Sequence, residues 1–452
     1  MHTSDTDTIV AVATAEGEAA IGIVRLSGPE AVLISGRCYR GARQLGDSLD
    51  RHLCWGRFIA SGEELDEILV AVMRGPRSFT GEDTVEIYCH GGPHLLRRAR
   101  EALVREGARP AERGEFTRRA FLNGRIDLTQ AEAVADMISA GSDLGLQSAY
   151  FQLRGGLRER FESLGEDLRQ AATLLEVELD FSDDVMVDRA EVRKAMARAR
   201  GEMEGLIRSY RTGKIIRQGA RVILAGRPNV GKSSLLNRLL EQDRAIVTPV
   251  PGTTRDTIEE SVDLDGIRVV LVDTAGLRAA QDAVEEEGTR RSRLSIEGAD
   301  LVLLVLDGSE GPREEDRSLL AGTGDRPRLL VVNKVDLGHH PDWQLEADRE
   351  GRVATSALTG EGLDALRESI RARVLEGEPS VGGQGVITHE RHVLALVEAL
   401  EALSRAQKAV DLPGEIVAME LHDALNALGA IVGQTTPEDV LDRIFSTFCI
   451  GK

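Results

Sequence analysis

Aromatic residues are scarce in this chain. Phe, Trp and Tyr make up 3% of its 452 residues, so its packing rests on aliphatic side chains. Cysteines are also few, and none of the four forms a C-x-x-C pair, which argues against a zinc cluster and a disulfide framework. The contents of 42% apolar and 29% charged residues are nevertheless typical of a globular protein. The length predicts two to four domains.

Long apolar segments are missing as well. The longest run, Leu301–Leu306, is far too short to cross a bilayer, and we find no charged-then-apolar leader. Acidic residues outnumber basic ones by 75 to 56, which gives a net charge of −19. This excess disfavours a broad non-specific surface for nucleic acid, although it is compatible with a local basic patch. We therefore expect a cytoplasmic protein that does not bind membranes.

A glycine-rich loop is the most informative feature that is present. Residues 226–233 read G-x-x-x-x-G-K-S and lie between a strand-like apolar run and a helix-like run. Glycines allow such a loop to wrap a polyphosphate and to aim backbone N–H groups at it. Lys232 adds a charge for the outer phosphates, and Ser233 supplies a hydroxyl to Mg²⁺. The pattern predicts a nucleoside triphosphate site.

Three later segments, the first two of which follow apolar runs, specify the nucleotide. Asp273–Gly276 can present a carboxylate to Mg²⁺ and a glycine amide to the γ-phosphate. In Asn333–Asp336, the carboxylate of Asp336 can accept two hydrogen bonds from guanine that adenine cannot donate. Ser356–Leu358 is placed to close over the base. Together these segments predict that the nucleotide is GTP.

The segment Pro251–Asp256 has the features of a nucleotide-dependent switch. A threonine at this place is the usual second hydroxyl ligand of Mg²⁺ and is ordered when the γ-phosphate is present. Leu277, directly after the D-x-x-G motif, cannot orient the attacking water as a glutamine would. The run Glu285–Glu287 offers carboxylates for that role, but it is equally compatible with an acidic helix start.

The order of the predicted elements indicates a multi-domain protein. Residues 1–122 have the pattern of an α+β domain. Residues 219–375 alternate strands and helices, as in a doubly wound α/β P-loop domain, with a hairpin turn at Asp265–Gly266. Helical periodicity occupies 123–218 and 376–452. The economical interpretation is one discontinuous all-α domain into which the GTPase domain is inserted.

The chain resembles the tRNA-modification GTPase family MnmE, also called TrmE, over nearly its whole length. Ribosome-assembly GTPases share the motifs in the middle, whereas the segments near both ends are specific to this family. The resemblance is carried by residues 7–11, 78–83, 90–93, 114–116, 119–124, 127–133, 226–237, 252–256 and 448–452, the last of which read Phe-Cys-Ile-Gly-Lys.

This resemblance implies an enzyme that adds an aminomethyl-type (carboxymethylaminomethyl) group to carbon 5 of the wobble uridine of certain tRNAs. It implies a homodimer, a flavoprotein partner, MnmG, in a heterotetramer, and a folate one-carbon donor such as 5-formyl-tetrahydrofolate. The positions that match the family's folate site are Arg25, Glu86, Arg125 and Lys452. A carboxylate suits the amine donors of the pterin, and cations suit the glutamate tail of the folate.

The resemblance also assigns ions and catalytic groups to the GTPase domain. Mg²⁺ would be held by Ser233 and Thr254, and K⁺ by Asn229, Thr248, Thr253 and the backbone carbonyl of Val250. K⁺ would supply the positive charge that an arginine finger brings elsewhere. Glu285 matches the glutamate that organises water and is the predicted catalytic residue, with Lys232 and Thr254. The predicted GTP-binding positions are Asn229, Val230, Gly231, Lys232, Ser233, Ser234, Thr248, Thr253, Thr254, Asp273, Thr274, Ala275, Gly276, Asn333, Lys334, Asp336, Ser356, Ala357 and Leu358.

Some positions depart from the family pattern. The usual Gly- and Arg-rich loop is replaced at 15–20 by Ala-Glu-Gly-Glu-Ala-Ala, and Arg113 stands in place of a proline. Arg125 stands where lysine is common. Cys449 is either a catalytic thiolate, which would need a lowered pKa, or a residue that lines the site.

A second interpretation belongs to another functional class. The GTPase motifs alone would also suit a GTP-gated switch that associates with RNA or ribosomes and carries out no modification. The terminal segments favour the modifying enzyme. A nucleotide-driven structural protein of the dynamin type is disfavoured, because no membrane-binding stretch is evident.

Overall fold

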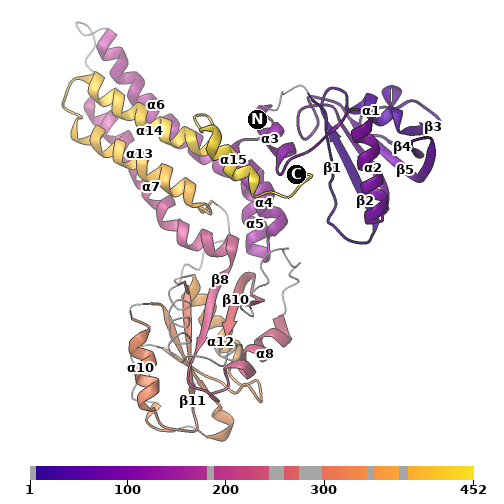
Figure 1. Ribbon diagram of the computed structural model, residues 1–452. Helices are drawn as coiled ribbons and strands as arrows, with labels where there is room; N and C mark the ends of the chain where they lie inside the picture. The colour runs from indigo at the N-terminus through magenta and orange to yellow at the C-terminus, as the bar shows by residue number, and fades with distance from the viewer. Residues whose placement is uncertain are drawn as a thin grey trace. The chain divides into compact units, whose positions relative to one another are not determined.

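The computed structural model describes residues 7–180, 188–243, 259–273, 298–324, 326–338, 340–343, 351–375 and 385–452 (Figure 1). It divides into two compact units. The first combines the chain up to Ala135 with Asn426–Lys452, and the second comprises Asp136–Leu425. Two helices, α4 (Leu128–Ser139) and α14 (Gly414–Val432), contain the boundaries between the units.

The first unit is built on a seven-stranded sheet in the order β3-β4-β5-β6-β2-β1-β7. Its neighbouring strands are antiparallel except for the parallel pair β1 and β7. Helices α1 (Ala31–Arg37) and α2 (Pro93–Arg105) contact the sheet. The strands are β1 (Ile9–Val12), β2 (Ala19–Ser27), β3 (Tyr39–Gly41), β4 (Leu53–Ala60), β5 (Glu63–Met73), β6 (Thr84–Gly91) and β7 (Arg109–Pro110).

Strand periodicity separates the two faces of this sheet. Successive side chains of a strand point to opposite faces. In β2 and β6, Val24, Leu26 and Ile87 belong to the core that the sheet forms with α1 and α2. Arg25 and Glu86, which are directly paired across these two strands, therefore lie on the other face.

The end of the chain returns to this sheet. Helix α15 (Glu438–Ser446) contacts α3 (Glu115–Leu122). A small core next to this contact includes Leu128, Phe445 and Phe448. The following residues reach β1. There Gly451 has φ +92°, and a Cβ atom on it would lie 2.5 Å from the carbonyl oxygen of Val12. A glycine is needed at this position both for its backbone conformation and for this close approach.

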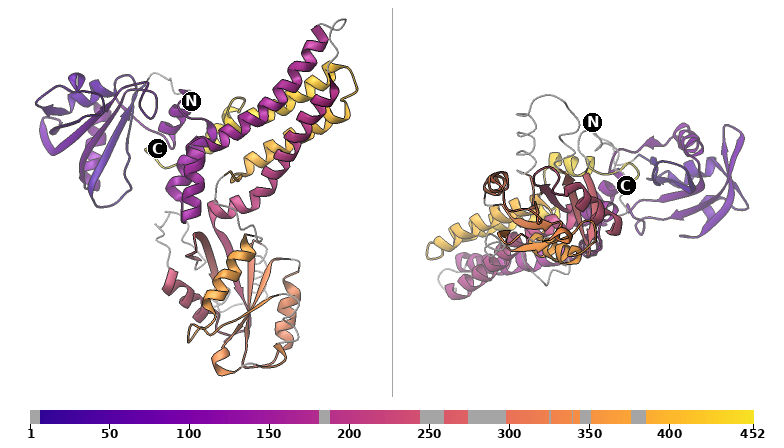
Figure 2. Two further views of the ribbon diagram at one scale, coloured as in Figure 1. Left: turned by 180° about the vertical axis from the view of Figure 1, so that it is seen from behind. Right: turned by 90° about the horizontal axis from the view of Figure 1, so that it is seen from below.

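The second unit contains long helices, α6 (Gly156–Asp180), α7 (Arg189–Gln218) and α13 (Glu390–Lys408), with the shorter α5 (Asp143–Leu153) beside them. Helix α7 packs against α5, α6 and α13, and the long helices lie side by side in the views of Figures 1 and 2. The buried residues of α7 recur at helical spacing, as an amphipathic helix requires.

A six-stranded sheet in the order β13-β12-β11-β8-β10-β9 forms the rest of this unit. Only β9 is antiparallel to its neighbour. Helices α8 (Lys232–Asp243) and α12 (Leu363–Val374) contribute to the core on one face, and α10 (Glu314–Gly322) packs on the other. The strands are β8 (Ala220–Ala225), β9 (Glu259–Leu264), β10 (Ile267–Asp273), β11 (Leu301–Asp307), β12 (Arg328–Asn333) and β13 (Arg352–Ala354).

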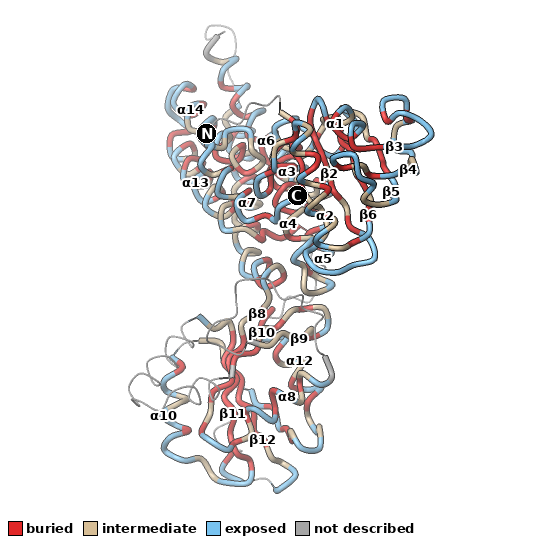
Figure 3. The backbone as a smooth tube through the Cα atoms, turned by 45° about the vertical axis from the view of Figure 1, so that its right-hand side comes forward, coloured by how far each residue is buried: buried red, intermediate tan, exposed pale blue. Residues whose placement is uncertain are grey.

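The central strands of this sheet are buried along most of their length, as Figure 3 shows in red. Every residue of β11 is buried. Alternate residues of this strand belong to the two cores: Leu303 and Val305 to one, and Leu304 and Leu306 to the other. This explains why the strands of a parallel sheet that is covered on both faces appear in the sequence as continuous apolar runs.

The predicted hairpin turn at Asp265–Gly266 is confirmed. Both residues have positive φ, 49° and 86°, as a type I′ turn between antiparallel strands requires. The carbonyl oxygen of Gly266 accepts a hydrogen bond from the backbone N–H of Leu144, at the start of α5, at 3.2 Å. The hairpin between the predicted switch segment and Asp273 thus contacts a helix outside the sheet domain. Within the ranges given above, no helix combines the length and hydropathy needed to cross a bilayer.

Candidate functional site

The phosphate-binding loop joins the end of β8 to the start of α8. Asn229 has φ +67° and Gly231 has φ +97°, so the loop turns through backbone conformations that most residues avoid. A Cβ atom on Gly231 would lie 2.3 Å from Nδ2 of Asn333, which makes glycine necessary there. The Nζ of Lys232 donates to the carbonyl oxygens of Gly226 and Arg227 at 3.0 and 2.8 Å. The loop therefore curls around the ammonium group that would face a polyphosphate.

Asn333 connects the two ends of the candidate nucleotide site. It is 1% exposed at the end of β12. Its Nδ2 donates to the carbonyl oxygen of Val230 in the phosphate loop at 2.9 Å. Its Oδ1 accepts from the backbone N–H of Ala357 at 3.0 Å. A single buried amide thus fixes the phosphate loop relative to the segment predicted to close over the base.

The carboxylate of Asp336 lies in this base-binding region. It accepts a hydrogen bond from the hydroxyl of Ser356. Next to it, Lys334 has φ +67°, and its Nζ contacts Oδ2 of Asp307 at 2.7 Å. Burial would raise the pKa of Asp307, but the hydrogen bonds from Lys334 and Ser309 outweigh burial and hold the pKa below its ordinary value. Asp307 therefore stays ionised and fixes Lys334, which leaves Asp336 as the acceptor for a base.

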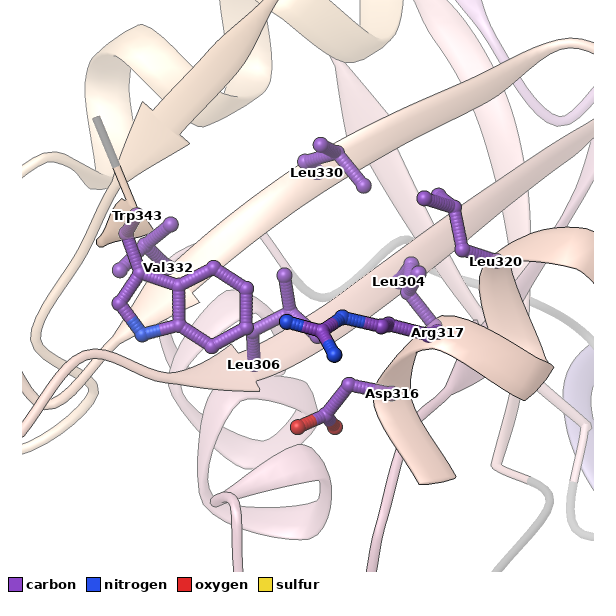
Figure 4. Close-up of a pocket in the computed structure, with 8 residues that line it drawn as sticks. All are labelled: Leu304, Leu306, Asp316, Arg317, Leu320, Leu330, Val332 and Trp343. Atoms are coloured by element: carbon purple, nitrogen blue, oxygen red, sulfur yellow. The ribbon is translucent and has the colours of Figure 1, made fainter. Parts of the chain in front are cut away.

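A buried ion pair holds the first half of the phosphate loop. The guanidinium of Arg227 donates to Oδ1 of Asp316 at 2.7 Å, and the two residues are 7% and 3% exposed. Asp316 also accepts from the backbone N–H of Arg313 at the start of α10. Figure 4 shows Asp316 projecting from α10 at the edge of a small apolar pocket that Trp343 also lines. Sequence reasoning missed this pair, because no pattern links two residues that lie so far apart in the chain.

The structure thus brings together part of the predicted GTP site. The predicted residues of the phosphate loop and of the base-binding segments meet at the carboxyl ends of β8, β12 and β13. Asp273 ends β10 of the same sheet. The remaining predicted residues lie outside the described part of the chain: Thr248, Val250, Thr253, Thr254, Thr274, Ala275, Gly276 and Glu285.

A second polar cluster lies on the sheet of the first unit. Nη2 of Arg25 contacts Oε1 of Glu86 at 2.7 Å, and their side chains are 18% and 15% exposed. The hydroxyl of Tyr88 donates to the other carboxylate oxygen at 2.7 Å. Burial and the adjacent carboxylate of Glu86 raise the pKa of Tyr88 to about 12. Tyr88 was not predicted, and its position two residues after Glu86, on the same face of β6, was the only signal.

The last residues of the chain complete this cluster. Nη1 of Arg25 donates to the carbonyl oxygen of Gly451 at 3.2 Å, and the carbonyl oxygen of Lys452 accepts from the backbone N–H of Phe116. Burial and the nearby Arg25 lower the pKa of the Lys452 ammonium. Cys449 is exposed. The structure therefore gathers Arg25, Glu86 and Lys452.

Arg125, the fourth predicted folate residue, is held elsewhere in the same unit. Its Nε donates to the carbonyl oxygen of Ser78 at 3.1 Å. No hydrogen bond or ion pair between described residues joins it to Arg25, Glu86 or Lys452.

Comparisons with known proteins agree with this architecture. Two protein-family models match: the N-terminus of the GTP-binding protein TrmE at residues 8–125, and the MnmE helical domain at residues 128–449. The chain is 45% identical over 454 residues to the tRNA modification GTPase MnmE of Syntrophus aciditrophicus (strain SB), covering 99% of both chains. It is 45% identical over 459 residues to that of Moorella thermoacetica (strain ATCC 39073 / JCM 9320), again covering 99% of both.

Two of the solved structures that match do so over part of this chain. The G domain of the FeoB iron transporter of T. maritima is 29% identical, with a TM-score of 0.27, and the match covers 35% of this chain and 98% of that one. A single-residue variant of Aquifex aeolicus Era, bound to GDP.AlF4⁻, is 26% identical, with a TM-score of 0.28, and the match covers 40% and 66%.

The fold and the nucleotide site define a multi-domain P-loop GTPase: an α+β N-terminal part, a helical part interrupted in the sequence, and an inserted α/β domain. The matches over almost the full length then specify the family. The chain belongs to the MnmE (TrmE) family of tRNA modification GTPases, and the resemblance seen in the sequence is confirmed.

Removal of Arg227 should weaken both the fold and the phosphate loop. Arg227→Met leaves the buried carboxylate of Asp316 without its partner, which we expect to cost about 3–5 kcal/mol in the free energy of unfolding. The double variant Arg227→Met/Asp316→Leu should regain most of that stability, yet both variants should release GDP faster than the wild type. Chemical denaturation and stopped-flow release of a fluorescent GDP measure the two effects.

Arg158→Met is the matched control for this experiment, because its ion pair with Glu162 is half exposed on α6 and such pairs contribute about 0–1 kcal/mol. A double variant that is stable and releases GDP at the wild-type rate would show that Arg227 does not position the loop.

Replacement of Asp336 tests how the base is read. In Asp336→Asn an amide replaces the acceptor for the guanine donors, and hydrogen bonds to charged groups contribute about 1.5–3 kcal/mol each. We expect GTP affinity to fall on the order of 100-fold and selectivity to shift toward xanthosine triphosphate. Titration with both nucleotides measures this, with the exposed Asp364→Asn as control. Unchanged selectivity for GTP would contradict the role of Asp336.

Proposed function

We propose that this GTPase works with the flavoprotein MnmG to modify carbon 5 of the wobble uridine of certain tRNAs with a carboxymethylaminomethyl-type group, using a tetrahydrofolate one-carbon donor. The observation that carries the proposal is the coexistence in one chain of the nucleotide site and of the cluster of Arg25, Glu86 and Lys452. A GTP-gated switch without modifying chemistry would have no use for the second cluster.

The residues of this cluster fit a folate. Glu86 has both oxygens directed to donors, Arg25 on one and Tyr88 on the other, so it is a fixed carboxylate that suits the amine groups of a pterin. Arg25 and Lys452 supply cations that suit the carboxylates of the folate tail. Arg125, whose Nε donates to the carbonyl oxygen of Ser78, would contact the folate from outside this cluster. When bound, 5-formyl-tetrahydrofolate or a related folate would supply the one-carbon unit.

The GTPase cycle would depend on two ions. Ser233, at the start of α8, and Thr254 would hold Mg²⁺, and Asn229 with Thr248, Val250 and Thr253 would hold K⁺. Ser233 and Asn229 flank the curled loop around Lys232, where the phosphates of GTP would lie. K⁺ would offset the charge that develops on the phosphates, and Glu285 would orient the attacking water.

We further propose a cytoplasmic homodimer in which the N-terminal domain, residues 1–122, contacts its copy. The sheet face opposite α1 and α2 exposes apolar side chains, including Trp55 and Leu69, which are directly paired across β4 and β5 and are 57% and 40% exposed. Burial of such a face in a dimer would be favourable. Residues 123–218 and 376–452 would form the helical domain, and 219–375 the inserted GTPase domain.

Mass analysis of wobble nucleosides tests the proposed reaction. Cells that lack this chain should lose the modified uridine, and the wild-type gene should restore it. Glu86→Gln should fail to restore it, because the amide cannot retain the carboxylate contacts, while the purified variant should hydrolyse GTP at a rate within about twofold of the wild type. Wobble nucleosides that are identical in the deleted and parental cells would refute the proposed function.

Replacement of Na⁺ by K⁺ tests the alkali-ion site. At equal ionic strength, kcat for GTP hydrolysis should rise at least about tenfold in K⁺, as expected for the gain of a charge that stabilises the transition state. In Asn229→Ala the difference between the two salts should shrink, because one ligand of the ion is lost. Equal wild-type rates in both salts would contradict the site. Phosphate release under steady-state conditions is the measurement.

A further inference from the structure

Helix α7 has the opposite charge to the rest of the molecule. The whole chain carries a net charge of −19, but the 30 residues of α7 include nine basic and three acidic side chains, a net charge of +6. The adjacent α6 has three basic and seven acidic side chains in 25 residues. The net negative charge of the protein repels a polyanion, whereas the positive charge of α7 attracts one locally.

The basic residues of α7 fall into two groups. Most of those toward the start of the helix have acidic partners: for example, Arg189 pairs with Glu178 at 2.7 Å, and Arg198 with Asp167 at 2.9 Å. Two of the helix's own acidic residues, Glu202 and Glu204, pair with Arg160 and Arg200. The last third of the helix, from residue 208 onward, contains four basic residues and no acidic one, and the last of the four, Arg217, pairs with Asp136 at 3.6 Å.

Three of these residues, Arg208, Arg211 and Lys214, form the basic face of α7. All three are exposed. Arg208 and Lys214 make no hydrogen bond or ion pair with any residue that the structure describes. The three follow one another at intervals of three residues, which is about 4.5 Å along a helix axis. They therefore present a row of positive charges over roughly two helical turns.

The opposite side of the same turns is occupied. The hydroxyl of Ser209 accepts from the backbone N–H of Ile387, and a Cβ atom on Gly213 would lie 2.1 Å from the carbonyl oxygen of Ile387. At about 100° per residue, Arg211 points roughly 160° away from both Ser209 and Gly213. The segment that leads into α13 thus packs against the side of α7 opposite Arg211, and the basic face remains accessible.

We propose that the basic face of α7, formed by Arg208, Arg211 and Lys214, binds the phosphate backbone of tRNA. This inference rests on the proposed function, which makes tRNA the substrate, and it adds the surface that receives it. Lys and Arg neutralise phosphates without reading sequence. Such a contact suits an enzyme that must position a folded RNA. It supplies affinity and orientation, and it leaves recognition of the wobble base to another site.

Binding of purified tRNA to the full-length protein tests this surface. The triple variant Arg208→Gln/Arg211→Gln/Lys214→Gln should bind tRNA on the order of tenfold more weakly at about 0.1 M salt. The slope of log K against log salt concentration should fall by about 2, since each lost phosphate contact removes about 0.7–0.9 from it. The GTPase rate should stay at the wild-type value, which also verifies that the variant is folded.

The same helix provides the matched control. Arg193→Gln/Lys194→Gln/Arg198→Gln removes the same charge near the start of α7, where Arg193 and Arg198 are already paired with Asp411 and Asp167. This variant should keep tRNA affinity and salt slope within about twofold of the wild type. An equal loss in both triple variants, or no loss in either, would overturn the proposal. A wild-type protein that binds no tRNA would instead refute the proposed function itself.

Discussion

The buried side chain of Asn333 is the interaction on which the nucleotide site depends. Through one amide, it bonds to the phosphate loop at Val230 and to the base-binding segment at Ala357. The two segments are more than a hundred residues apart in the chain. A buried amide with a partner on each side is strongly held, because loss of either hydrogen bond would leave a polar group unsatisfied. The buried ion pair between Arg227 and Asp316 is a second contact that holds the phosphate loop in place.

The second site is organised in a different way. The cluster of Arg25, Glu86 and Tyr88 lies on one face of the sheet near the start of the chain, and Gly451 and Lys452 join it from the end of the chain. The close approach of Gly451 to Val12 holds this end of the chain against β1. The two sites are therefore supported differently. The nucleotide site is held by the ends of parallel strands and by the buried amide of Asn333, whereas the cluster of Arg25 and Glu86 is completed by the C-terminal residues that pack against β1.

Charge distribution adds a third element. A protein as acidic as this one can bind a polyanion only where the charge is locally reversed, and α7 is such a place. The same helix leads directly, through Gly219, into β8 and the phosphate loop. The hairpin at Gly266 contacts α5 beside it. Nucleotide site, hairpin and basic helix are thus joined by short, ordered connections.

The sequence alone determined the fold class of each domain and the position of the nucleotide-binding motifs. Apolar runs before Gly226 and Asn333 predicted the parallel strands that present the nucleotide motifs, and Asp265–Gly266 predicted the hairpin, because these patterns follow from local backbone chemistry. Strands β3 and β4 give only weak signals in the sequence: β3 is three residues long, and Arg57 interrupts the apolar pattern of β4.

Only the tertiary structure decided which side chains meet. The pair of Arg227 and Asp316, the position of Tyr88 beside Glu86 and the separate place of Arg125 depend on how distant segments pack. Local propensity acts over a few residues along the chain, whereas these contacts are fixed by the burial of whole elements against one another. A sequence therefore predicts its motifs and strands, and the packed core selects their partners.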